Sequence, residues 1–104
     1  MGNLGFPFCP VHPGELLKEE LECRHISQRS FALKLGFPYT ALNEILNGKR
    51  PVTTEFALLM EAALNVDPGL LLRLQTSYNL QVAKKDKKLI DRFNEIRKRA
   101  VAVF

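Results

Sequence analysis

The sequence QRSFALKLGFPYTALNEILNG, residues 28–48, decides the fold of this chain. It has the pattern of two short amphipathic helices joined by a turn at Gly36. Ala32 is small where two helices must approach closely, and Gly36 tolerates the positive φ that such a turn needs. Leu42 and Ile45 then share one face of the second helix. This spacing predicts a helix-turn-helix, the motif whose second helix lies in the major groove of DNA.

Further helices are predicted on both sides of this pair, since apolar residues recur at helical spacing along the chain. No segment shows the alternation of a strand, so the predicted class is all-α. Each helix start has a residue that suits a cap or a first turn. The predicted starts are Pro13, Ser27 as a cap, Pro38, Thr53 or Thr54 as a cap, and Asp67–Pro68. A lysine-rich connector is predicted over residues 81–88, and a sixth helix over residues 86–100.

The predicted core consists of the apolar stripes of these helices. The residues expected to face inward are Leu16, Leu17, Leu21, Phe31, Ala32, Leu35, Leu42, Ile45, Leu46, Phe56, Leu59, Met60, Ala63, Leu64, Leu71, Leu74 and Tyr78.

The length of 104 residues and the hydrophobic content of 46% suit one globular domain with a modest core. We expect an N-terminal arm over residues 1–11, a helix-turn-helix domain over 12–80 and a basic, helical extension over 81–104. No apolar run approaches the length of a membrane span, and the first residues lack the pattern of a secretory signal. A cytoplasmic location is therefore expected.

The net charge of +4 is unevenly distributed. Residues 81–104 hold eight basic and three acidic groups, whereas residues 37–80 are slightly acidic. A basic protein is attracted to phosphate, but here the most basic segment lies outside the predicted recognition helix. A solvated tail helix is the simple alternative explanation of this segment.

The two cysteines and two histidines do not form a convincing metal site. Cys9-x2-His12 and Cys23-x-His25 lack the spacing that converges four ligands on zinc. We expect two unpaired thiols, with Cys23 against the core. The motifs of hydrolases, metalloproteases and phosphate-binding loops are missing, so neither an enzyme nor a cofactor is predicted.

The outward face of residues 38–47 is where DNA would be read. Tyr39 lies at the N-terminal end, which reaches base edges first. Thr40 and Asn43 are three residues apart and share a face. Asn43 can donate and accept together, as adenine requires, and the methyl group of Thr40 can meet that of thymine.

Four other residues are predicted to hold the DNA backbone on either side of this helix. They are Gln28, Asn47, Lys49 and Arg50. Glu44 repels phosphate, so we expect it to face away or to accept a hydrogen bond from cytosine. Ordinary surface polarity would explain all of these residues equally well if they stood outside a two-helix frame.

The chain resembles the HigA-type antitoxins of the XRE/Cro helix-turn-helix group, also known as virulence-associated protein I. The resemblance runs from about His12 to Leu80. It is carried by HPGELLKEEL, SQRSFALKLG, NEILNGKRPVTTEFALLMEAAL and LLLRLQTSYNL. The turn at 22–25 departs from the family, where glycine is expected before the isoleucine. The resemblance does not extend to residues 81–104.

The resemblance implies a lambda-repressor/Cro-like five-helix DNA-binding domain, here with an additional C-terminal helix, that acts as a homodimer. It implies binding to double-stranded operator DNA, autorepression of a toxin–antitoxin operon and neutralisation of a RelE-like ribonuclease toxin. The family's base-reading positions correspond to Tyr39, Thr40 and Asn43, and its phosphate-binding positions to Gln28, Asn47 and Lys49. We expect the dimer surface on the fifth helix and the apolar face of 89–96.

Two other functions fit the same residues. A stand-alone XRE-family regulator would have the same DNA site and no toxin. A protein-interaction module that has lost DNA binding would explain the slight acidity of residues 37–80.

Overall fold

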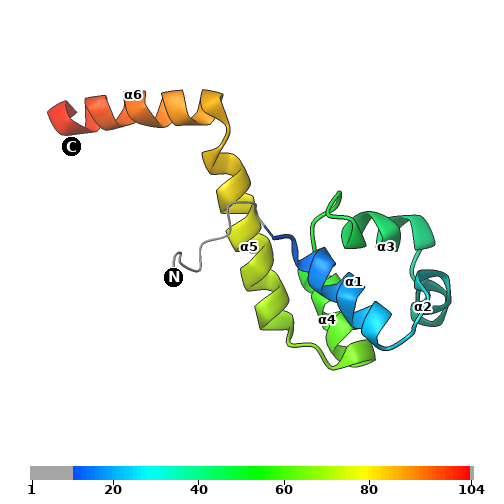
Figure 1. Ribbon diagram of the computed structural model, residues 1–104. Coiled ribbons are helices and arrows are strands. Elements are labelled where there is room, and N and C mark those ends of the chain that lie inside the picture. Colours follow the sequence, from blue (N-terminus) through cyan, green and yellow to red (C-terminus); the bar gives the residue numbers. More distant parts are fainter. Residues whose placement is uncertain (1–10, 104) are drawn as a thin grey trace, which may run out of the picture.

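Six α-helices form the part of the chain that the computed structural model describes, residues 11–103 (Figure 1). No strand occurs within this range, which confirms the predicted all-α class. The predicted arm and Cys9 lie almost entirely outside it. The helices are α1 (Pro13–Cys23), α2 (Gln28–Leu35), α3 (Tyr39–Leu46), α4 (Thr54–Leu64), α5 (Pro68–Lys84) and α6 (Lys87–Val103).

The helix starts are fixed by side-chain caps, which satisfy backbone N–H groups that have no partner inside the helix. The Ser27 hydroxyl accepts from the Ser30 amide at 3.1 Å, and Thr53 accepts from Phe56 at 3.2 Å. Asp67 accepts from the Gly69 amide at 3.0 Å. These caps confirm three of the predicted helix starts.

The core lies between α1, α2, α3, α4 and the first half of α5. Most of the predicted inward residues are buried or half-buried, but two predictions are wrong. Cys23 is exposed, because it follows Leu21 by two residues and so lies about 200° further round α1. Ala63 is exposed at the edge of the α4 stripe, where Ala57 is buried instead. The buried cluster comprises Leu17, Leu21, Phe31, Ala32, Leu42, Ile45, Leu46, Val52, Phe56, Ala57, Met60, Leu64 and Leu71.

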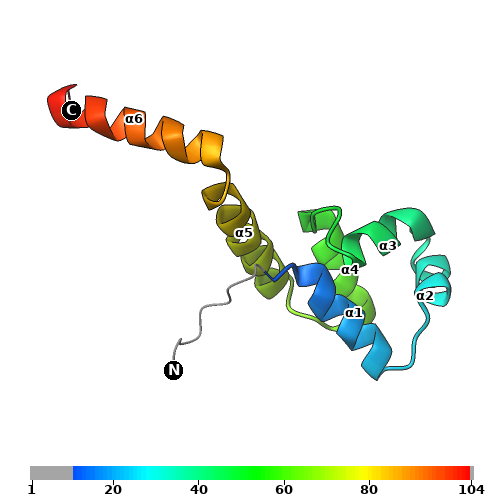
Figure 2. The same ribbon diagram turned by 45° about the horizontal axis from the view of Figure 1, so that its top comes forward.

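The helix pair α2–α3 and helix α6 lie at opposite ends of the molecule (Figures 1 and 2). Helix α5 continues to Lys84, so the predicted connector over 81–88 is wrong, and only residues 85 and 86 separate α5 from α6. The Asp86 carboxylate accepts from the Lys88 amide at 3.0 Å and so starts α6 anew. Among the described residues, none of these helices is long and apolar enough to cross a membrane.

Candidate nucleic-acid interface

Helices α2 and α3 meet through a tight turn at Gly36. This glycine has a φ of 68°, in the left-handed region. A residue with a Cβ atom adopts this conformation only at a cost in free energy. The Phe37 amide bonds back to the Ala32 carbonyl at 3.0 Å, which closes the turn. Ala32 itself is buried where the two helices approach. The pair is therefore a rigid frame, with the outward face of α3 beside the start of α2.

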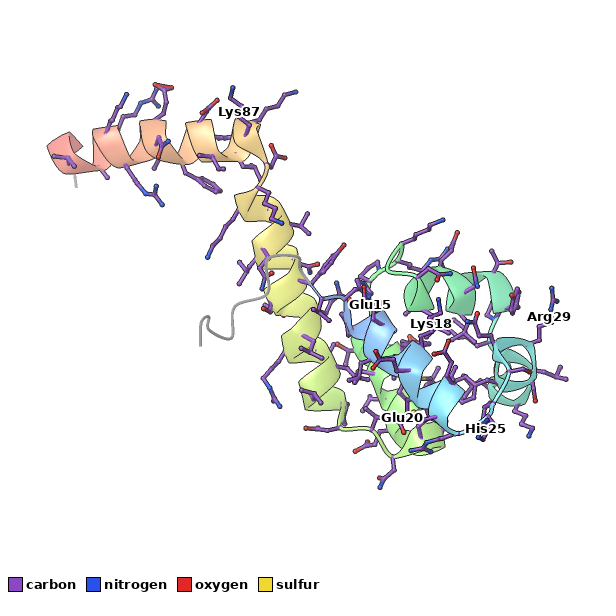
Figure 3. The ribbon with its side chains drawn as sticks, in the orientation of Figure 1. Glu15, Lys18, Glu20, His25, Arg29 and Lys87 are labelled. Atoms are coloured by element: carbon purple, nitrogen blue, oxygen red, sulfur yellow. The ribbon has the colours of Figure 1, made fainter. Side chains whose placement is uncertain are left out.

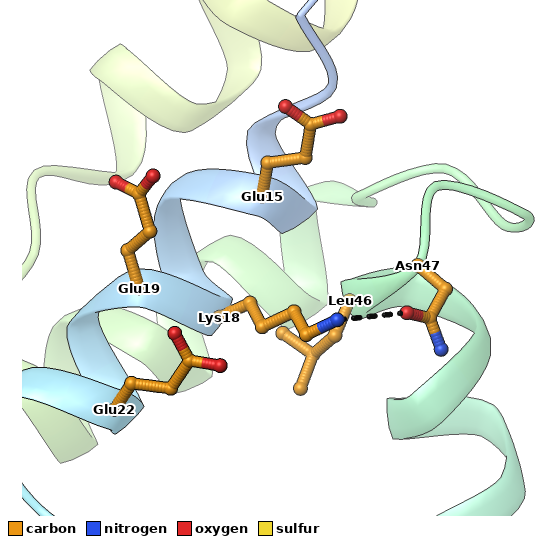
Figure 4. A pocket seen from close by; sticks show the side chains of 6 residues that line it. All are labelled: Glu15, Lys18, Glu19, Glu22, Leu46 and Asn47. Atoms are coloured by element: carbon orange, nitrogen blue, oxygen red, sulfur yellow. Dashed lines mark hydrogen bonds between the residues drawn. The ribbon is translucent and has the colours of Figure 1, made fainter.

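Three of the predicted DNA-binding residues form one row of hydrogen bonds across this frame. The Asn43 amide nitrogen donates to Gln28 Oε1 at 2.9 Å. The Asn47 amide nitrogen donates to Asn43 Oδ1 at 3.2 Å. Lys18 extends the row from α1, since its Nζ lies 3.3 Å from Asn47 Oδ1 (Figure 4). The structure thus brings together Gln28, Asn43 and Asn47, and it adds a lysine that the sequence patterns did not single out.

Asn43 retains the hydrogen-bonding capacity that adenine needs. An asparagine amide has two N–H donors and an oxygen with two lone pairs. In this row Asn43 uses one donor toward Gln28 and one lone pair toward Asn47. One N–H and one lone pair are left over, which matches the acceptor and donor of the adenine edge in the major groove.

Tyr39 and Thr40 lie at the exposed N-terminal end of α3. The guanidinium carbon of Arg29 lies 4.4 Å from the centroid of the Tyr39 ring. This cation–π contact fixes the ring and places a positive charge beside it. Figure 3 shows the Arg29 side chain directed outward at this end of the molecule. The sequence patterns did not single out Arg29, although it directly follows Gln28, a predicted phosphate-binding residue.

Glu44 and Arg50 form a salt bridge, with 2.7 Å between Arg50 Nη2 and Glu44 Oε1. The partner of Glu44 is therefore a side chain of the same subunit. The pair cancels the repulsion that Glu44 would exert on phosphate, and it also neutralises Arg50. Lys49 is exposed in the loop between α3 and α4.

An acidic groove of about 420 Å³ borders this row on the α1 side. Glu15, Glu19 and Glu22 line it, together with Lys18 and the end of α3 (Figure 4). Carboxylates repel a phosphate backbone, so a surface that faces DNA would extend from α2 and α3 to Lys18 and Asn47 at the rim of this groove and no further.

A family model described as Helix-turn-helix matches residues 17–71, more than half of the chain, from within α1 to within α5. Virulence-associated protein I of Dichelobacter nodosus is 34% identical over 82 residues, which cover 78% of this chain and 76% of that protein.

Two solved structures share the fold of most of the chain. An addiction module antidote protein of the HigA family from Coxiella burnetii is 36% identical, with a TM-score of 0.71, over 82% of this chain and 95% of that one. The antitoxin HigA of Pseudomonas aeruginosa, solved with the higBA promoter, is 27% identical, with a TM-score of 0.71, over 80% of this chain and 92% of that one. Both are covered almost whole, whereas part of this chain has no counterpart in them.

Proposed function

Because the chain belongs to the XRE-type helix-turn-helix family, and within it to the HigA-type antitoxins, we propose that it binds its own operator as a repressor and neutralises a cognate toxin. The observation that carries DNA binding is the Gln28–Asn43–Asn47 row on the exposed side of α2 and α3. It fits a relative that was solved with promoter DNA. The toxin of this proposal is a RelE-like ribonuclease.

In this proposal Tyr39, Thr40 and Asn43 read base edges from the major groove. The remaining polar groups around α3 hold phosphates and set the docking angle. Arg50 joins them by exchanging Glu44 for phosphate. The phosphate-binding set is Gln28, Asn47, Lys49 and Arg50, to which the structure adds Lys18 and Arg29 as candidates.

We propose that two copies bind together. One recognition helix reads too few base pairs to define a site, and a two-fold pair places two such helices about 34 Å apart, one turn of duplex. The surface proposed for pairing is apolar and uncovered in one copy. It consists of a shallow groove on α5, lined by Leu72 and Leu80 among others, and the stripe of Ile90, Phe93 and Ile96 on α6.

DNA binding is tested by titrating the chain against the region upstream of its own gene and against shuffled DNA of the same composition. Specific binding to the upstream region, with log K falling linearly as log salt rises, is the expected result. A flat salt response, or no binding at all, would favour a protein-interaction module.

The antitoxin role is tested by expressing the neighbouring small gene with and without this chain. We expect growth arrest from that gene alone and rescue when both are expressed. Operator binding without any rescue would instead identify a stand-alone regulator.

A further inference from the structure

Gln75 of α5 holds the end of the α3–α4 loop (residues 47–53). Its side chain is 6% exposed. Its Oε1 accepts from the Val52 amide at 2.8 Å, and its Nε2 donates to Asn79 Oδ1 at 2.9 Å. A buried amide left without a partner is costly, so this contact ties the loop to α5.

His12 holds the middle of the same loop from the other side. It is 2% exposed, and its Nδ1 accepts from the Gly14 amide at 2.9 Å. The backbone of Arg50 also lies near this side chain and acts to raise its pKa. With Nδ1 accepting, the neutral ring carries its proton on Nε2.

The His12 ring also fills the space between the loop and α5. Its centroid lies 4.8 Å from that of Tyr78, with the rings edge to face at 80°. On the loop side, Gly48 has a φ of 75° and packs against the ring, so a Cβ atom there would lie 3.5 Å from His12 Cβ. The ring is thus in contact with α1, α5 and the loop together.

We propose that His12 and Gln75 are positioning residues for DNA binding, which hold the α3–α4 loop against α5 so that Asn47, Lys49 and Arg50 meet the DNA backbone in a fixed arrangement. This inference rests on the proposed function. Both side chains are buried, so neither reaches DNA itself. They act through the loop, and the phosphate contacts of the loop depend on the position of α5.

The advantage is that the loop loses its conformational entropy when the protein folds, and not when it binds DNA. Fixing the backbone of a free residue costs conformational entropy, and a free loop of several residues would lose that entropy when it met DNA. A loop already fixed by His12 and Gln75 avoids this cost.

A purely structural role is the competing explanation, and three variants separate the two. His12→Asn keeps a good N-cap for α1 but lacks the ring that packs between Gly48 and Tyr78. Gln75→Met keeps length and packing but removes the acceptor for Val52. Gln81→Met is the matched control, since Gln81 is also a glutamine of α5 and contacts Ser77 at 3.4 Å.

The measurements are the salt dependence of DNA binding, amide hydrogen exchange at Val52 and thermal unfolding. Each phosphate contact adds about 0.9 to the slope of log K against log salt, so we expect His12→Asn and Gln75→Met to lower the slope by about 1 to 2. Affinity should fall about tenfold on operator and shuffled DNA alike, because phosphate contacts carry no sequence information. Gln75→Met should also speed exchange at Val52, and Gln81→Met should change none of these.

Two results would overturn the inference. Folded variants that bind with an unchanged affinity and an unchanged slope would reduce both residues to structural roles and leave the proposed function intact. Failure of the unmodified chain to bind any DNA would remove the proposed function and this inference with it.

Discussion

The side-chain amide of Asn43 donates to Gln28 across the helix-turn-helix, at 2.9 Å. A residue proposed to read a base is therefore held by a residue proposed to bind the backbone. The rotamer of Asn43 is set before DNA arrives, and free donor and acceptor positions remain on its amide. Such preorganisation reduces the side-chain entropy that binding must remove.

Replacing Asn43 by Ala should weaken operator binding by about 1–3 kcal/mol, the worth of one bidentate base contact, and leave binding to shuffled DNA almost unchanged. Competition titrations with the two DNAs measure the difference. Asn94→Ala on α6 is the matched control and should have no effect. Equal losses on both DNAs would show that Asn43 contacts the backbone.

The Gln28–Asn43 contact also predicts an interaction between the two substitutions. If Gln28 orients Asn43, the double variant Gln28→Ala/Asn43→Ala should lose less operator affinity than the sum of the single losses. The expected coupling is about 0.5–3 kcal/mol, the range for residues in direct contact. Strict additivity in this double-mutant cycle would mean that the two side chains act on DNA independently.

Glu44→Gln should strengthen binding to every DNA sequence. The substitution removes a negative charge near the backbone and releases Arg50 from its 2.7 Å salt bridge. Affinity should rise several-fold at low salt, because Arg50 no longer has to leave Glu44 before it meets phosphate, and the gain should shrink as salt is added. Glu95→Gln, on α6 at the other end of the molecule, is the control. Weaker binding would assign Glu44 to a base contact with cytosine.

The local sequence was sufficient to predict the helix-turn-helix, because each of its signals acts within a few residues. Ser27 caps the next turn, and Gly36 relieves a positive φ at its own position. Such signals depend on backbone chemistry alone, so tertiary packing does not change them. The same holds for the cap at Asp67.

Tertiary contacts account for what the sequence did not reveal. His12 is separated from Arg50 and Tyr78 by most of the domain, and Gln75 from Val52 by 23 residues. Lys18 reaches Asn47 only because α1 packs beside the end of α3. Periodicity can tell which face of a helix is buried, but it cannot say which loop a buried polar side chain will hold.

Gly14→Ala should destabilise the fold severely, because the start of α1 packs against the backbone of α3. A Cβ atom on Gly14 would overlap the Ile45 carbonyl oxygen, which cannot move without distorting α3. We expect the free energy of unfolding to fall by at least about 2 kcal/mol, as overpacking a rigid contact typically costs. Gly69→Ala is the control, since its nearest neighbour is the flexible tip of Arg73. Equal stability of both variants in urea unfolding would contradict the close approach.

Stability should depend on pH through His12. Burial lowers the pKa of His12 below 6.5, and this outweighs the nearby Glu15 carboxylate and the Arg50 backbone, which raise it. Protonation also removes the acceptor that caps α1. The contribution of neutral His12 to the free energy of unfolding is therefore complete above about pH 6.5. It is lost as the pH falls from there through the folded-state pKa of His12. The other polar or charged groups around the ring are Lys49, Gln75, Tyr78 and Asn79.

Urea unfolding between pH 5 and 8 measures this dependence. The unmodified chain should lose stability across the lower part of the range. His12→Asn, which cannot titrate there, should show a flatter profile at a lower plateau. Parallel profiles for the two proteins would assign the pH dependence to other groups.

Phe93→Asp should convert the proposed homodimer into monomers. Phe93 is 40% exposed in one copy and lies in the apolar stripe of α6, so a carboxylate there would be buried without a partner if α6 pairs. Sedimentation equilibrium should show half the mass of the unmodified protein, and affinity for a two-half-site operator should fall to that for one half-site. Leu58→Asp is the control, since Leu58 is 52% exposed on α4, outside the proposed surface. If Phe93→Asp sediments with the mass of the unmodified protein while Leu80→Asp sediments with half that mass, the pairing surface lies on α5 alone.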